Sequence, residues 1–95
     1  MPMRIVVYGT TSDATAYAAM AQIRSLIREM GVDAGVQIVT DEKQREMQGI
    51  ESTPAVAIEG MTVSAGWVPS RTELRRAIQQ HIEMASGKSS LSQDE

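Results

Sequence analysis

The chain has 95 residues, enough for one domain but not for two, and its 42% hydrophobic content is typical of a globular protein. The formal net charge is -3, and one Trp with two Tyr is too few for a base-stacking platform, so no nucleic acid partner is expected. Zero Cys and a single His exclude thiolate chemistry, disulfides and multi-histidine metal sites. We therefore expect neither a metal nor a cofactor.

Membrane association is also not expected from the sequence. No apolar run approaches the length of a membrane span, and the first residues lead directly into a strand pattern without signal-peptide form. The expected location is the cytoplasm.

The N-terminal third has the pattern of a strand followed by a helix. Residues 3–8, MRIVVY, form a short apolar run rich in β-branched residues, which predicts a buried strand. Residues 14–30 contain apolar side chains at spacings of three and four and nothing that breaks a helix. Gly31 is a natural residue for the end of that helix.

Turn residues separate this strand from this helix. The segment 9–13, GTTSD, ends in Ser12 and Asp13, and both are good N-cap residues. A nucleophilic role for Ser12 would need a base, and the only histidine lies near the end of the last predicted helix. We therefore expect Ser12 to cap the helix.

A second strand and a short helix follow. Residues 35–39 are predicted to form a strand, because three of them, Val36, Ile38 and Val39, are apolar. Thr40 or Asp41 then caps a short polar helix that ends near Gly49.

The next segment has the pattern of a β-hairpin. Residues 55–58 and 61–65 are two strand candidates, and Glu59 and Gly60 form the two-residue connection between them. Glu-Gly is a weaker turn signal than Asn-Gly, but its length favours an antiparallel pair.

The last helix begins at a capping box formed by Ser70 and Glu73 and is expected to reach Ala85. From there the composition changes to small and polar residues, so we expect a domain over residues 1–85 and a disordered tail over 86–95.

Three arginines lie close together in this last helix, at positions 71, 75 and 76. Pairing with Glu73 and ordinary solvation are sufficient to explain them, so no anion site is expected.

The predicted order is β-α-β-α-β-β-α. Strands joined through a helix pair in parallel, and the hairpin adds antiparallel strands. The expected fold is α/β, with a mixed four-stranded sheet flanked by helices.

The sequence resembles the small thioredoxin-like proteins called redox-active disulfide proteins over roughly residues 3–83. The motifs that carry the resemblance are Ser52-Thr53-Pro54, Glu59-Gly60, Gly66-Trp67-Val68-Pro69-Ser70 and the N-terminal stretch VVYGTTSDAT. The resemblance implies a thioredoxin-like fold.

The redox cysteines of that family fall at Ser12 and Thr15. Disulfide exchange needs a thiolate, and a hydroxyl at the same place has no comparable acidity. The oxidoreductase activity of the family is therefore not expected here, and no catalytic residue is assigned.

The resemblance also implies a binding groove around a cis-proline loop. The expected groove residues are Thr11, Ser12, Asp13, Thr15, Thr53, Pro54, Gly66 and Trp67. A cis bond before Pro54 could offer the backbone of Thr53 to an extended peptide, or it could only shape the turn. Trp67 could anchor a partner, or its ring could only cover the end of the hairpin.

Three functional hypotheses follow. The first is a redox-inactive module that binds a peptide or protein partner in this groove. The second is an enzyme that holds a thiol or anionic substrate near Ser12 and Thr15. The third is a structural protein that dimerises, and the expected state is a monomer or a weak homodimer.

Overall fold

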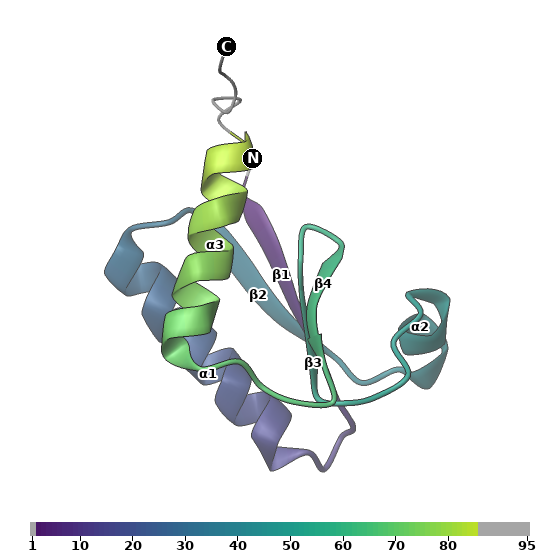
Figure 1. The fold of residues 1–95 in the computed structure, drawn as a ribbon. Helices are drawn as coiled ribbons and strands as arrows, with labels where there is room; N and C mark the ends of the chain where they lie inside the picture. The colour runs from purple at the N-terminus through teal and green to yellow at the C-terminus, as the bar shows by residue number, and fades with distance from the viewer. Residues whose placement is uncertain (1, 86–95) are drawn as a thin grey trace.

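The computed structural model describes residues 2–85, and the predicted order of strands and helices is confirmed (Figure 1). The elements are β1 (Met3–Tyr8), α1 (Ala14–Met30), β2 (Ala34–Val39), α2 (Glu42–Met47), β3 (Ala55–Ile58), β4 (Met61–Ala65) and α3 (Arg71–Ala85). The expected tail over 86–95 lies outside the described residues.

The four strands form one mixed sheet in the order β2-β1-β3-β4. β2 pairs with β1 in parallel, whereas β3 is antiparallel to both β1 and β4. The mixed four-stranded sheet expected from the sequence is confirmed, with the apolar strands β1 and β3 at its centre.

The strand register places four residues in one row across an end of the sheet. Tyr8 is opposite Val39 on one side and Ala55 on the other, and Ala55 is opposite Ala65. The segments that follow β1, β2 and β4, and the segment that precedes β3, therefore all lie at this end. We call it the loop end of the sheet.

The main core lies between the sheet and the helices α1 and α3, which cover the same face (Figure 1). Side chains alternate along β1, so that Ile5 and Val7 face this core while Val6 and Tyr8 belong to a smaller cluster on the other face. α2 lies beside that second face, and none of its residues is buried.

Local sequence signals account for the turns. Glu59 and Gly60 both have positive φ, 51° and 82°, as a two-residue hairpin turn of the primed type requires. The capping box at α3 is present, because the Ser70 N–H donates to Glu73 Oε1 at 2.9 Å and the Glu73 N–H donates to Ser70 Oγ at 3.1 Å.

Candidate functional site

Asp13 caps α1, so the expectation that Ser12 would be the cap is wrong. Asp13 Oδ1 accepts hydrogen bonds from the backbone N–H groups of Thr15 at 3.0 Å and Ala16 at 3.2 Å. These donors stand two and three residues after the cap, where a capping oxygen reaches them, and Ser12 is one residue too early. The hydroxyl of Ser12 is exposed and makes no hydrogen bond within residues 2–85.

The 9–13 loop packs directly against the first turn of α1. A Cβ atom placed on Gly9 would lie only 2.6 Å from the Cβ of Ala16, which is closer than real side chains approach. The Gly9 N–H also donates to the Val39 carbonyl at 3.0 Å, which ties the loop to the end of β2. The exposed side chains of Thr11 and Thr15 are thus presented from a fixed backbone.

The 52–54 loop lies in contact with the segment after β4. The Thr53–Pro54 peptide bond is cis, and both residues are half-buried. The Gly66 N–H donates to the Pro54 carbonyl at 2.8 Å, and Gly66 has a φ of 90°, which favours glycine. A Cβ atom on Gly66 would also lie 3.2 Å from the Cβ of Ser52, so the two loops are closely packed.

Trp67 follows this contact and is 49% exposed. This half-exposure fits both expected roles, an anchor for a partner and a cover for the end of the hairpin. The structure joins the Pro54 and Trp67 loops by a hydrogen bond and places the 9–13 loop at the same end of the sheet. The eight expected groove residues are thus gathered at the loop end.

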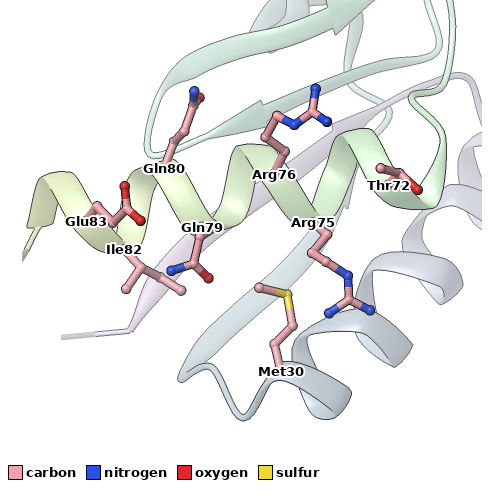
Figure 2. A pocket seen from close by; sticks show the side chains of 8 residues that line it. All are labelled: Met30, Thr72, Arg75, Arg76, Gln79, Gln80, Ile82 and Glu83. Carbon is pink, nitrogen blue, oxygen red and sulfur yellow. The ribbon is translucent and has the colours of Figure 1, made fainter.

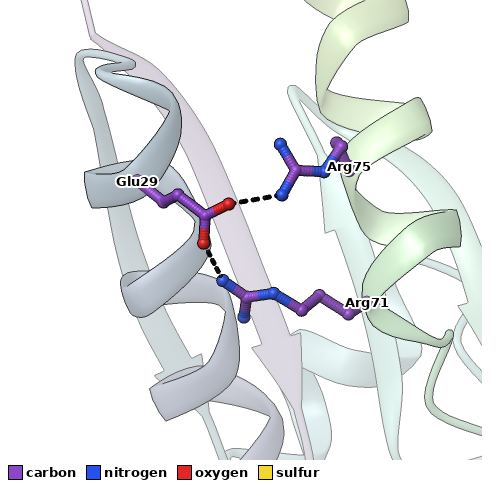
Figure 3. Close-up of polar contacts among 3 residues, drawn as sticks. All are labelled: Glu29, Arg71 and Arg75. Carbon is purple, nitrogen blue, oxygen red and sulfur yellow. Dashed lines mark hydrogen bonds and ion pairs between the residues drawn. The ribbon is translucent and has the colours of Figure 1, made fainter.

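Sequence reasoning assigned the wrong partner to the arginines of α3. Glu29, on α1, binds both Arg71 and Arg75 through its two carboxylate oxygens (Figure 3), with 2.6 Å between Arg75 Nη2 and Glu29 Oε2. Hydrogen bonds from Arg75 and then from Arg71 lower the pKa of Glu29 below 4.5. Glu73 bonds the start of its own helix instead of pairing with these arginines.

A second feature that the sequence did not reveal is a surface hollow of about 640 Å³ along α3 (Figure 2). It is lined by Met30, Thr72, Arg75, Arg76, Gln79, Gln80, Ile82 and Glu83. None of these belongs to the loop end. The hollow is larger than one of about 370 Å³ beside β1 and β3 and one of about 350 Å³ beside α2.

Residues 2–85 contain neither a metal-binding cluster nor a membrane-spanning helix. Within 2–85, no group of three or more His, Asp or Glu side chains is placed to hold a metal ion. Over the same part of the chain, no helix combines the length and apolar character needed to cross a membrane.

The thioredoxin domain model matches residues 3–79. The chain belongs to the thioredoxin domain family. It is similar to the structure of thioredoxin 1 from Thermosipho africanus, with a TM-score of 0.61 at 15% identity over 87% of this chain and 98% of that one. It is also similar to a crystal structure of a Bordetella parapertussis protein, with a TM-score of 0.60 at 20% identity over 85% of this chain and 99% of that one. No curated protein matches it.

This thioredoxin-like domain contains no cysteine anywhere in its 95 residues. The fold that positions a redox pair is therefore present without the thiols that do the chemistry. At the structural neighbours' identities of 15% and 20%, the likeness concerns the fold alone.

Proposed function

We propose that this protein is a redox-inactive thioredoxin-like module that binds an extended segment of a peptide or protein partner at the loop end. The observation that carries the proposal is the exposed Trp67 beside the Gly66–Pro54 hydrogen bond. Tryptophan provides a large contact area at a low cost in side-chain entropy, which makes it a frequent anchor of binding surfaces.

Two properties of the site support a peptide as the ligand. Thr53 lies two residues before β3, where its backbone can form strand-like hydrogen bonds with an added segment. The surrounding loops are held by the Gly9–Val39 and Gly66–Pro54 contacts, so little conformational entropy would be lost on binding.

The other two hypotheses gain no specific support from the structure. Ser12 has no hydrogen-bonded base among residues 2–85, so nothing there activates its hydroxyl. Dimerisation and the cytoplasmic location stay predictions from the sequence.

The test compares partner capture by the wild-type chain, Trp67→Ala and Met61→Ala. Met61 is 55% exposed at the other end of β4, so its substitution removes a similar exposed apolar surface outside the site. Partners identified by mass spectrometry should be retained by the Met61 variant and lost by the Trp67 variant. Equal retention by both variants would contradict the proposal.

A peptide array made from a captured partner gives the second measurement. A short linear segment should bind the chain and shift the NMR signals of residues 9–15, 52–54 and 66–67. Shifts confined to other surfaces would show that the loop end is not the site.

A further inference from the structure

We infer that a hollow on the second face of the sheet binds a small zwitterionic molecule with a flat apolar body, which is the chemistry of an aromatic amino acid. The hollow has a volume of about 370 Å³, and we call it the sheet hollow. Besides the β3–β4 turn, it is lined by Arg4, Val6, Tyr8, Gln48, Ala57 and Glu59. It contains none of the eight groove residues of the loop end, so the inference is independent of the proposed function.

The position of the sheet hollow follows from the alternation of side chains along β1. Ile5 and Val7 face the main core beneath α1 and α3, so Arg4, Val6 and Tyr8 lie on the opposite face. α2 lies beside this face and buries none of its own residues against it (Figure 1). The volume of the hollow is within the range of small-molecule sites in proteins, about 300–1,000 Å³.

The hydroxyl of Tyr8 is the first argument for a ligand. Tyr8 is 6% exposed, and its hydroxyl makes no hydrogen bond within residues 2–85. Among the buried and half-buried residues of that range, Ser64 Oγ is the only fully enclosed side-chain oxygen or nitrogen without a partner, so the Tyr8 hydroxyl is not enclosed. Since Tyr8 lines the sheet hollow, its hydroxyl opens into that space. A buried tyrosine normally bonds its hydroxyl to a partner, and a ligand can supply the missing group.

Two opposite charges lie farther along the sheet hollow and are the second argument. The Glu59 N–H donates to the Arg4 carbonyl and the Arg4 N–H donates to Glu59 Oε2, both at 2.8 Å, so the two residues lie side by side. Within residues 2–85 the guanidinium of Arg4 nevertheless makes no ion pair, with Glu59 or with any other carboxylate. The backbone contact fixes one oxygen of Glu59 and leaves Oε1 free to accept a hydrogen bond.

These two charges favour a ligand that carries both signs. Of the described residues that line the sheet hollow, only Arg4 and Glu59 are charged, so the formal charges of the lining cancel. An anion or a cation alone would leave one of the two without a partner. A zwitterion can satisfy both, because its carboxylate can bind the guanidinium of Arg4 and its ammonium group can donate to Glu59 Oε1.

The region between the charges and the Tyr8 hydroxyl is apolar. Val6 and Ala57 are paired across β1 and β3 and line this part of the hollow. Tyr8 follows Arg4 by four residues, which is about 13 Å along a strand. One small ion therefore cannot contact both ends, whereas a molecule with a flat apolar body between two polar ends can. Gln48 adds an amide to the lining, which can donate or accept.

The test is a titration of the isotope-labelled 95-residue chain with L-tryptophan, followed by NMR. Tryptophan has both charges, a flat apolar ring and an indole N–H that can donate to the Tyr8 hydroxyl. The amide signals of residues 4–8 and 57–60 should shift and reach saturation. Tryptamine, which lacks the carboxylate, and indole-3-propionate, which lacks the ammonium group, should each bind about two- to fivefold more weakly, the range for one exposed ion pair.

Two substitutions with matched controls locate the ligand. Tyr8→Phe removes only the hydroxyl and should weaken tryptophan binding by about two- to tenfold, the range for one hydrogen bond. Tyr17→Phe removes the same group from the exposed surface of α1 and should leave the affinity unchanged. Arg4→Gln should weaken the binding of tryptophan but not of tryptamine, which has no carboxylate for Arg4 to bind. Arg24→Gln removes the same charge from α1 and should weaken neither. Circular dichroism on each variant confirms that it is folded.

Four results would overturn the inference. Without saturable shifts at residues 4–8 and 57–60, the sheet hollow does not bind a ligand of this class. Equal affinities for tryptophan and its two analogues would mean that the charges take no part. Equal weakening by Tyr8→Phe and Tyr17→Phe would remove the Tyr8 hydroxyl from the site. Shifts confined to residues 9–15, 52–54 and 66–67 would place tryptophan at the loop end instead.

Discussion

The carboxylate of Glu29, near the end of α1, accepts a hydrogen bond from the guanidinium of Arg75 in the second turn of α3, with 2.6 Å between Oε2 and Nη2. Arg71 binds the other oxygen of the same carboxylate. One acidic side chain thus joins the two helices that cover the main core.

The Glu29 contact predicts a pH dependence of stability. Its pKa is lowered below 4.5 by Arg75 first and Arg71 second, so the folded state binds this proton less readily than the unfolded state. The stabilisation that the Glu29 contact gives the folded state is therefore fully present above pH 4.5, the pKa of the unfolded state. It is lost as the pH falls below 4.5 and through the lower pKa that Glu29 has in the folded state. Urea midpoints of wild type and Glu29→Gln should differ near neutral pH and converge in acid.

Glu46→Gln is the control for that experiment, because Glu46 is exposed on α2 and makes no ion pair within residues 2–85. Its midpoint should stay close to the wild-type value at neutral pH. The Glu29 effect should also shrink with added salt, since both of its partners are partly exposed. A difference between Glu29→Gln and wild type that grows in acid would contradict the prediction.

The cap of α1 gives a second prediction. Asp13→Ala should lower the free energy of unfolding by about 1 kcal/mol, because two backbone N–H groups lose their acceptor. Asp13→Asn should retain most of the stability, since asparagine caps helices equally well. Ser12→Ala should have little effect. Urea denaturation measures all three, and a larger loss for Ser12→Ala than for Asp13→Ala would refute the assignment.

Two glycines provide a matched pair of substitutions. Gly9→Ala should destabilise the domain by about 1–3 kcal/mol, because the new Cβ would lie 2.6 Å from the Cβ of Ala16. Gly35→Ala should be neutral or slightly stabilising, since nothing lies within 4 Å of its Cβ position. Thermal melts compare the two. Similar melting temperatures for both variants would mean that the 9–13 loop does not pack against α1 as described.

Two serines should respond in opposite ways to the same substitution. Ser64 is buried, and its Oγ has no hydrogen-bond partner within residues 2–85, so Ser64→Ala removes an unsatisfied polar group and should preserve or raise stability. Ser70→Ala removes the capping oxygen of α3 and should cost about 1 kcal/mol. Chemical denaturation tests both, and a clear loss for Ser64→Ala would show that its hydroxyl has a partner.

The redox prediction concerns positions 12 and 15. Wild type should show no dithiothreitol-dependent insulin reduction, because it has no thiol. Ser12→Cys with Thr15→Cys should form an intramolecular disulfide, as the family resemblance places its cysteines there. Neither substitution changes the Asp13 cap, so little stability should be lost. Thiol titration after mild oxidation decides the matter, with Ser12→Cys alone as the control. Two free thiols in a folded double variant would argue against the correspondence of positions.

Most of the fold was predictable because its signals are local. The β-branched run in residues 3–8, the three-and-four spacing in residues 14–30 and the Ser70–Glu73 capping box each describe a few neighbouring residues. Their order then restricted the topology, since parallel strands need a crossover and a two-residue turn needs an antiparallel pair.

The remaining features depend on how distant segments pack. The Glu29–Arg75 contact joins residues 46 apart, and no local pattern gives the relative placement of α1 and α3. The choice between Ser12 and Asp13 as cap depended on a shift of one residue in the helix start. The exposure of Trp67 likewise follows from the packing of its loop on Pro54, which only the structure reveals.

The segment 40–54, which contains α2, joins two strands that lie on opposite sides of β1. Ile50 is its one buried residue, and the rest of the segment contributes exposed or half-buried side chains. The core is therefore assembled by two halves, residues 3–39 and 55–85, and the connection between them meets mostly solvent. The part of this connection that holds α2, which has no buried residue, is where the domain can accept inserted or altered sequence, and so where a new surface could evolve without disturbing the packing of Ile50 and of the 52–54 loop.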